Sequence, residues 1–304
     1  MRFGFFAAFV LAAAVLVLWS GTAGASPTVR PQPEAKKHPT IQVGALDPKY
    51  NPILDMDFEV SLDLGLITGY HIESQNDSGA RGGVSGIFPL WPDLGLYVNA
   101  GVSADTWNGK SGLGVTLGAA MYGEYGLDCG LMWDWLSPDT GVSLYQIRLF
   151  AQTGFTETDR IGIRLNIPMN KDTFTSYPTT IEWEFEPVFV GGLYWQHSWL
   201  DEIATEGGLY YAGGNVSSAM FSLAAMYVVN ERVNFRFSAF GDFSGKDLDI
   251  GLFVTFRIGP GAVVKPAYES LRYYHMGTSS HGNFKMKTPY GALAPAWDPS
   301  LYWN

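Results

Sequence analysis

The sequence predicts an all-β fold, a transmembrane antiparallel up-and-down β-barrel of about 12 strands, with about 10 or 14 strands as alternatives. In the segment 247–258, every even position is large and apolar, whereas the odd positions are mostly polar or small. This two-residue period gives a strand one apolar face and one polar face. Similar segments recur along most of the chain, and aromatic residues make up 15% of it. Because no helices are available to cover so wide an apolar face, we expect that face to contact lipid.

The first 25 residues have the features of a secretory signal peptide. Arg2 precedes an apolar run from Phe3 to Trp19, and small residues end the segment at Ala23-Gly24-Ala25. This is the pattern of a signal-peptidase site, so we expect cleavage after Ala25, with an uncleaved membrane anchor as the alternative. Residues 26–56 are rich in proline and basic side chains and show no apolar period. They are predicted to form an extended periplasmic linker.

Residues 57–258 are predicted to form the barrel. The first strand shows the clearest alternation besides the last one, since Phe58, Val60 and Leu62 alternate with Glu59 and Ser61. Glycine, proline and asparagine residues mark turns between the segments. The expected strands are 57–69, 83–89, 94–102, 113–121, 127–135, 145–152, 160–167, 181–189, 207–212, 216–229, 233–239 and 247–258. The first and last of them are expected to meet at the seam that closes the barrel.

Two of these segments need a separate argument. The stretch 207–230 carries no charged residue and is long enough to cross a bilayer as a helix, but its glycine pairs favour strands and turns. The segment 181–189 carries three acids on one strand face, which cannot lie in lipid. If the preceding hairpin turns near residue 174, Arg164 lies opposite Glu184 inside the barrel.

The closing segment ends in Phe256 and Ile258, and it resembles the closing strand of bacterial outer-membrane β-barrels, the porin-like superfamily. The resemblance names no single family. It implies that the first and last strands of the barrel both have their free chain ends on the periplasmic side. It also implies that the protein is in the cell outer membrane. It also implies contacts with outer-membrane lipids and lipopolysaccharide, periplasmic chaperones and the barrel-assembly machinery. The tail, residues 259–304, departs from the common pattern, in which the chain ends with the last strand.

The inward face of the predicted barrel carries the candidate functional residues. They are charged side chains on the polar faces of the strands: Glu59, Asp63, Arg148, Arg160, Arg164, Glu182, Glu184, Glu186, Asp249 and Arg257. Fixed charges of this kind bias which solutes pass through a pore, so we expect a passive channel for small solutes. The alternative is a non-conducting structural or surface-interaction barrel, in which ion pairs fill a narrow interior. A second alternative is an outer-membrane enzyme that hydrolyses lipid or peptide, with His71, Glu73 and Asp77 as its candidate residues.

Several other functions are disfavoured. The formal net charge of -10 argues against a nucleic-acid partner. The five histidines are scattered without metal-ligand spacing, and no short nucleotide-binding or hydrolase motif occurs, so we expect no metal, no cofactor and no enzyme. The single cysteine, Cys129, has no partner for an internal disulfide and falls on an apolar strand face. Most tryptophans lie near strand ends, as expected of aromatic belts at the membrane interfaces.

Overall fold

The computed structural model describes the predicted barrel almost completely and four short parts of the tail. The described residues are 58–71, 75–91, 94–107, 110–122, 127–138, 141–176, 181–213, 218–230, 232–243, 247–259, Ala267, His275, 285–287 and 293–295. The predicted signal peptide, its cleavage site and the linker lie outside the described residues. No helix in the described part of the chain is long and apolar enough to cross a membrane.

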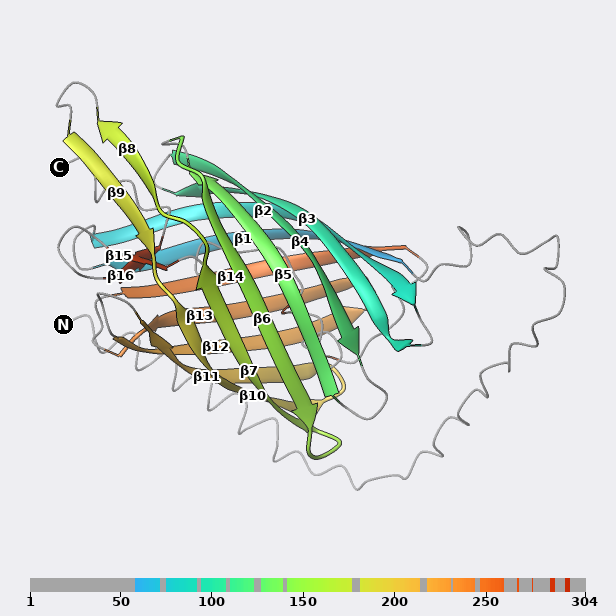
Figure 1. Ribbon diagram of the computed structural model, residues 1–304. Helices are drawn as coiled ribbons and strands as arrows, with labels where there is room; N and C mark the ends of the chain where they lie inside the picture. Colours follow the sequence, from blue (N-terminus) through green and yellow to red (C-terminus); the bar gives the residue numbers. More distant parts are fainter. Residues whose placement is uncertain are drawn as a thin grey trace, which may run out of the picture. The chain divides into compact units, whose positions relative to one another are not determined.

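Twelve strands close into one antiparallel barrel, in the order β1-β14-β13-β12-β11-β10-β7-β6-β5-β4-β3-β2 (Figure 1). They are β1 (Glu59–His71), β2 (Gln75–Trp91), β3 (Leu96–Trp107), β4 (Lys110–Tyr122), β5 (Leu127–Pro138), β6 (Leu144–Gly154), β7 (Asp159–Pro168), β10 (Val190–Leu200), β11 (Ile203–Ala212), β12 (Ser218–Asn230), β13 (Val233–Asp242) and β14 (Asp247–Ile258). The prediction of a closed antiparallel barrel of about 12 strands is confirmed. The helical alternative for residues 207–230 is wrong, because this stretch forms most of β11 and all of β12.

A second, smaller sheet lies apart from the ring of strands. It has the order β16-β15-β9-β8 and contains β8 (Asp172–Ser176), β9 (Ile181–Pro187), β15 (Lys285–Lys287) and β16 (Leu293–Pro295). Two of these strands follow β7 along the chain, and the other two come from the tail. The tail therefore contributes to the folded structure beyond the last barrel strand.

The seam between β1 and β14 closes the barrel, as the sequence predicts. The register is unbroken from Val60 opposite Ile258 to His71 opposite Asp247. A shift by one residue would turn the apolar face of either strand inward, and its charges toward lipid. The strong alternation of these two strands therefore specifies where the ring closes.

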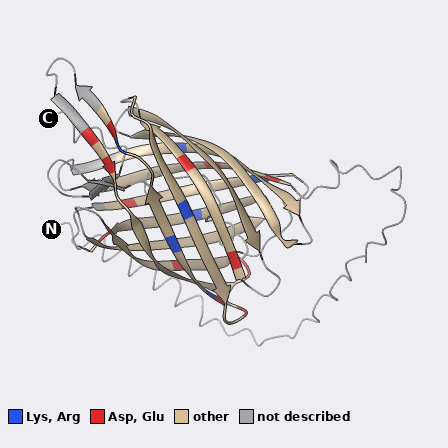
Figure 2. Cartoon of the chain, in the orientation of Figure 1, with Lys and Arg blue, Asp and Glu red and all other residues tan. Residues whose placement is uncertain are grey.

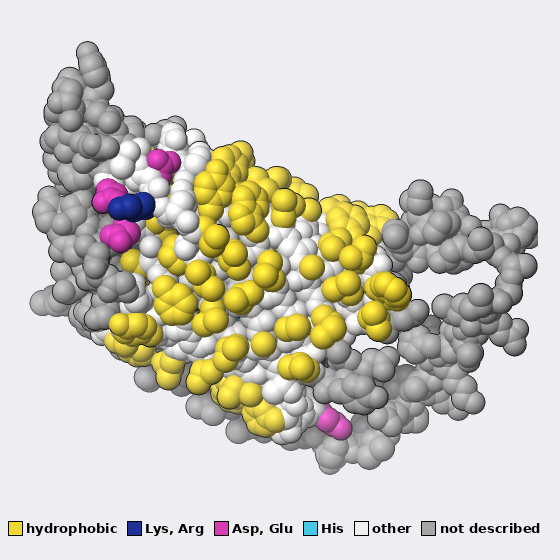
Figure 3. All heavy atoms as spheres, in the orientation of Figure 1, with side chains coloured by type: hydrophobic (Ala, Val, Ile, Leu, Met, Phe, Trp, Pro, Cys, Tyr) yellow, Lys and Arg dark blue, Asp and Glu magenta, His cyan; other side chains and the backbone are white. Residues whose placement is uncertain are grey.

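Outward and inward positions alternate along every barrel strand. On the seam strands, Leu64, Leu66, Leu252 and Phe256 are exposed on the outer wall. Figure 3 shows hydrophobic side chains across the visible wall, with charged side chains visible only near its two ends. An apolar outer belt of this kind replaces contact with water by contact with lipid acyl chains.

One strand assignment from the sequence is wrong. The segment 181–189 was expected to be the eighth barrel strand, but β10 takes that place and pairs with β7 from Val190 opposite Asn166 to His197 opposite Asp159. The earlier segment forms β9, which pairs with β8. The chain leaves the barrel after β7, where the Asn170 side chain bonds to the backbone of Ser143 and Tyr145 beside β6. This local anchoring directs the next residues into a separate hairpin.

The barrel has two open ends, which we call the terminal end and the loop end. The terminal end is where β1 begins and β14 ends, and it carries the short turn at residues 201–202 between β10 and β11. The loop end is opposite, and the hairpin of β8 and β9 connects β7 to β10 there. These names locate the functional side chains along the interior.

Candidate functional site

The inward face of the barrel brings together most of the charged residues that the sequence selects. Glu59, Arg148, Arg164, Asp249 and Arg257 are buried there. Asp63 and Arg160 lie on the same inward face and are half-buried. Figure 2 shows acidic and basic positions on neighbouring strands of the ring. The interior is thus polar and charged, although the barrel exterior is apolar.

Asp134 is the centre of a dense hydrogen-bond network in the described interior. Arg148 binds its carboxylate at two points, with Nε 2.5 Å from Oδ2 and Nη2 2.9 Å from Oδ1. Gln146 donates to Oδ2 at 3.0 Å, and the Thr116 hydroxyl donates to Oδ1 at 2.7 Å. Four donors from β4 and β6 therefore hold one carboxylate of β5. Burial of a charge is tolerated where such partners surround it.

A second network crosses the seam. Arg257 of β14 lies 3.5 Å from the carboxylate of Glu59 on β1. Further from the terminal end, the Thr255 hydroxyl donates to Asp63, the residue directly opposite it, at 2.5 Å. The Ser61 hydroxyl also donates to Glu59, at 3.2 Å. The inward polar residues of the two seam strands therefore bond to each other, in addition to the backbone ladder.

Aromatic rings share the interior with these charges. The guanidinium of Arg164 lies 4.6 Å from the centre of the Tyr210 ring, and that of Arg236 lies 4.5 Å from the Phe253 ring. Stacking on an aromatic face is a favourable setting for a partly desolvated guanidinium. The Tyr194 hydroxyl donates to Gln152 at 3.0 Å. The interior can therefore offer both charges and flat apolar surfaces to whatever enters it.

A residue of the tail, His275, lies inside the barrel and is 4% exposed. Its Nε2 is 3.0 Å from Oε2 of Glu206 on β11, and Gln196 donates to the same oxygen at 2.9 Å. A carboxylate can only accept hydrogen bonds, so Nε2 of His275 is the donor. Its ring centre is 4.4 Å from that of Tyr194, and its backbone carbonyl accepts a bond from Arg148 at 3.2 Å.

Sequence reasoning did not select His275 or Glu206. The tail shows no period that would place His275, and the expected ninth strand began one residue after Glu206. The register of β11 does contain a signal, because Glu206 shares the inward face with Gly208 and Tyr210. An acid on the same strand face as these residues, four positions after the turn at 201–202, indicates the interior.

The predicted pairing of Arg164 with Glu184 is wrong. Arg164 of β7 lies opposite Phe150 on β6 and Gly192 on β10. Three glutamates of the predicted site, Glu182, Glu184 and Glu186, belong to β9, so they are absent from the barrel wall. These glutamates alternate with apolar residues because β9 is a strand that pairs with β8. Since β9 is outside the barrel wall, its three acids need not face lipid.

Glu184 has a different partner in the structure. It is 48% exposed and forms an ion pair with Lys171, which lies between β7 and β8. The hydrogen bond and the charge of Glu184 raise the pKa of the Lys171 ammonium. Both groups are well exposed, so the pair contributes little to stability.

The outer rim at the terminal end has a cluster of its own. Asp159 of β7 accepts bonds from Trp195 Nε1 at 3.0 Å and from the Thr156 hydroxyl at 2.6 Å, and lies 2.8 Å from His197 Nδ1. The Trp199 ring lies 4.5 Å from that of His197. Trp195 and Trp199 are both exposed on the outside. The two tryptophans lie near strand ends, as in the aromatic belts of membrane proteins at the membrane interface. The Asp159 carboxylate lies beside them and accepts hydrogen bonds from several donors.

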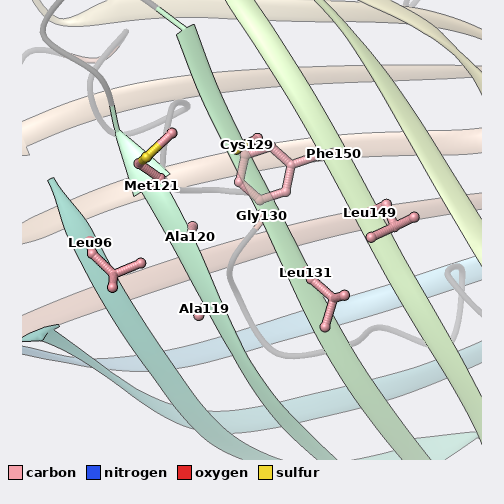
Figure 4. A pocket seen from close by; sticks show the side chains of 9 residues that line it. All are labelled: Leu96, Ala119, Ala120, Met121, Cys129, Gly130, Leu131, Leu149 and Phe150. Atoms are coloured by element: carbon pink, nitrogen blue, oxygen red, sulfur yellow. The ribbon is translucent and has the colours of Figure 1, made fainter. Parts of the chain in front are cut away.

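The outer wall also has a shallow apolar hollow of about 390 Å³. Figure 4 shows the small residues Ala119, Ala120 and Gly130 between larger side chains that include Leu131 and Leu149. Its lining carries no charged side chain, so the hollow belongs to the apolar belt. Cys129 lies on this wall and is half-buried.

The structure does not test the candidate enzyme site. Glu73 and the side chains of His71 and Asp77 lie outside the described residues. Among the residues that the structure describes, no three His, Cys, Asp or Glu side chains are grouped as metal ligands.

Comparisons with solved structures identify the fold. An outer membrane channel from Pseudomonas putida F1 is similar with a TM-score of 0.50 and 9% identity, over 70% of this chain and 100% of that chain. The KdgM porin has a TM-score of 0.49 and 10% identity, over 66% and 99% of the two chains. The NanC porin has a TM-score of 0.46 and 13% identity, over 65% and 100%. No protein-family model and no curated protein matches the sequence. The chain has the fold of an outer-membrane β-barrel.

Proposed function

We propose that the protein is a passive channel for small solutes in the bacterial outer membrane. The observation that carries this proposal is the contrast between the two faces of one closed ring of strands. The outer wall exposes large apolar side chains, whereas the inner wall buries arginines, carboxylates and amides. In a membrane, this arrangement stabilises a polar interior across the apolar layer.

The size of the ring is compatible with a narrow passage. Barrels of about 8 strands have interiors filled by side chains, and those of about 16 to 18 strands leave a broad aqueous channel. The twelve strands of this ring lie between these cases. The similarity to an outer membrane channel from Pseudomonas putida F1 supports the fold, and the proposal goes one step beyond the fold.

Interior charges would act as the selectivity element. Arg148 and Arg164 lie on the neighbouring strands β6 and β7, with Asn166 directly opposite Arg148. Asp134 neutralises Arg148 in part, while Arg164 is stacked on Tyr210. Rings of fixed charge favour solutes of opposite charge and disfavour those of like charge. We therefore expect the passage to discriminate between anions and cations of similar size.

Planar-bilayer recording of the purified full chain tests the proposal. We expect discrete conductance steps, and a reversal potential in a salt gradient that departs from zero. The matched variant is Arg164→Gln, which removes a charge and keeps an amide of similar length. Its reversal potential should shift toward cation selectivity. Absence of discrete steps in every variant, under conditions where folding is confirmed, would refute the proposal.

A non-conducting barrel is the second candidate function, because one observation favours it. His275 of the tail occupies part of the interior and bonds to both Glu206 and Arg148. A barrel with a filled interior is a structural or surface-interaction protein.

A further inference from the structure

Described residues of the tail contact the barrel at two levels and the hairpin of β8 and β9 at a third. At the terminal end, the Ala267 amide donates to the carbonyl of Asp201 in the turn between β10 and β11, at 2.7 Å. Ala267 is fully buried and packs with Ala204, Met226 and Val228, which lie on the inward faces of β11 and β12. Ala267 therefore lies at the inner edge of the terminal end.

At the second level, the His275 side chain lies against the part of the inner wall that runs from β6 through β7 and β10 to β11. Glu206 is the fourth residue of β11 from the terminal end, and Arg148 is the fifth residue of β6 from the loop end. His275 bonds to both of them, at 3.0 Å through its ring and at 3.2 Å through its carbonyl. Phe150 adds a second aromatic contact, with ring centres 5.6 Å apart. These contacts place the residue deep in the interior.

At the third level, β15 pairs with β9, with Met286 opposite Pro187 and Lys287 opposite Glu186. The strand β9 belongs to the connection at the loop end. The wall of the barrel is closed, and successive described tail residues contact the terminal end, the interior and the loop-end connection. Of the described tail residues, Ala267 thus lies at the terminal end, His275 in the interior and β15 at the loop-end connection.

The groups that surround the His275 side chain have the chemistry of a ligand site. Glu206 offers a buried carboxylate, and Gln196 holds that carboxylate in place from β10. Tyr194 and Phe150 offer aromatic faces, and Arg148 offers a donor for a carbonyl oxygen. This arrangement suits a planar ligand ring that carries N–H groups, above all a cationic one. The carboxylate would accept a hydrogen bond from the edge of that ring, and the aromatic side chains would pack against it.

We propose that the barrel interior contains a binding site for planar nitrogen rings of the imidazolium type, and that His275 occupies it as an intramolecular ligand which closes the passage. The closing role rests on the proposed channel function, whereas the binding site does not. The tail then acts as a competitor for solutes of the same chemistry. Passage follows when the ring of His275 leaves Glu206.

The variant His275→Ala tests both parts, with His197→Ala as the matched control. His197 is a histidine with a carboxylate partner on the outer rim, and it makes no contact with the interior network among its described interactions. Glu206→Gln is a second variant, which keeps the size of the side chain and changes the same hydrogen bond. It tests the closing role even if His275→Ala folds poorly. All proteins are full-length and refolded in the same lipid.

Two measurements are made on each protein, namely conductance in planar bilayers and the thermal unfolding midpoint with and without added imidazole hydrochloride. We expect His275→Ala and Glu206→Gln to raise the mean conductance by about tenfold, because each removes a charge-assisted hydrogen bond that holds the closed state. Imidazole should fill the space left in His275→Ala, raise its unfolding midpoint and reduce its conductance again. His197→Ala should behave as the wild type.

The outcomes separate the two proposals. Wild-type conductance in both His275→Ala and Glu206→Gln, in proteins that show discrete steps, would overturn the closing role. An unfolding midpoint of His275→Ala that imidazole leaves unchanged would overturn the binding site. If imidazole stabilises His275→Ala but no protein conducts, the binding site stands and the channel function is refuted.

Discussion

Replacement of Asp134 by asparagine should destabilise the barrel strongly. The carboxylate is fully buried and accepts four hydrogen bonds, two of them from Arg148. Asparagine keeps the oxygen that faces Thr116, but it directs an amide nitrogen at the donors of Arg148 and Gln146. The guanidinium of Arg148 then keeps its charge without a carboxylate beside it. Loss of one partner from a buried ion pair costs about 3–5 kcal/mol.

Reversible unfolding in guanidinium chloride with lipid vesicles would measure this cost. We expect the unfolding free energy of Asp134→Asn to fall by about 3 kcal/mol with an unchanged denaturant slope, since the surface exposed on unfolding is the same. Glu184→Gln is the control, because it also converts an acid to its amide but at an exposed ion pair. The control should unfold as the wild type does.

A double-mutant cycle would isolate the interaction itself. Asp134→Asn, Arg148→Gln and the double variant give the coupling energy of the pair, free of effects on other partners. The buried geometry predicts that the double variant is more stable than the sum of the single changes implies. If the unfolding free energy of Asp134→Asn were within about 0.5 kcal/mol of the wild-type value, the stabilising role of the Asp134 network would be refuted. Substitutions at ordinary surface positions change the unfolding free energy by that amount.

Three further predictions concern the wall. Gly162→Ala should lower the unfolding free energy by about 1–3 kcal/mol in the same denaturant assay, because its new Cβ would lie 2.8 Å from the Ala151 carbonyl oxygen and collide with the Tyr194 ring. Gly207→Ala is the control and should be nearly neutral, because its Cβ meets one side-chain atom at 3.8 Å. Glu184→Lys should leave the ion selectivity of any bilayer current unchanged, because β9 is not part of the barrel wall; a reversed selectivity would show that this hairpin lines the passage. Leu66→Arg places a charge on an outward side chain that is 68% exposed, and should cost about 2–4 kcal/mol in a lipid bilayer if it lies near the midplane; an unchanged free energy of folding would contradict the lipid-facing assignment.

Local periodicity was sufficient to predict most of the barrel. The seam strands alternate along most of their length, so the face of most of their residues follows from the sequence alone, and the register agrees. Ile67 and Phe253 are the exceptions, because these apolar side chains are buried on the inward face. The inward charges Arg148, Arg164 and Asp249 could be selected on the same basis. These predictions depend on a rule that acts within one strand, namely that neighbouring side chains point to opposite faces.

The exchange of β9 for β10 could not be predicted in this way. The segment of β9 alternates well, whereas β10 has adjacent glycines and several polar residues that weaken its period. Gly192 is required by a neighbouring strand, because a Cβ there would lie 2.6 Å from Cα of Tyr210. That requirement comes from β11 and is absent from any local pattern. Strand pairing depends on residues distant in sequence, so alternation alone cannot choose between two candidate strands.

The position of His275 was equally inaccessible. Its partners Glu206 and Arg148 are 69 and 127 residues away along the chain. The tail sequence has no amphipathic period that would place it. A residue whose surroundings are built by other strands carries no signal in its own neighbourhood.

The course of the tail has a consequence for assembly. The strand β14 must pair with β1 to complete the ring, and the tail that follows β14 has His275 inside that same ring. If the ring closed first, the end of the chain would have to be threaded through a finished barrel to bring β15 to β9. The simpler order is that the tail lies between the two halves of the sheet before the seam forms. Closure of the seam would then enclose His275.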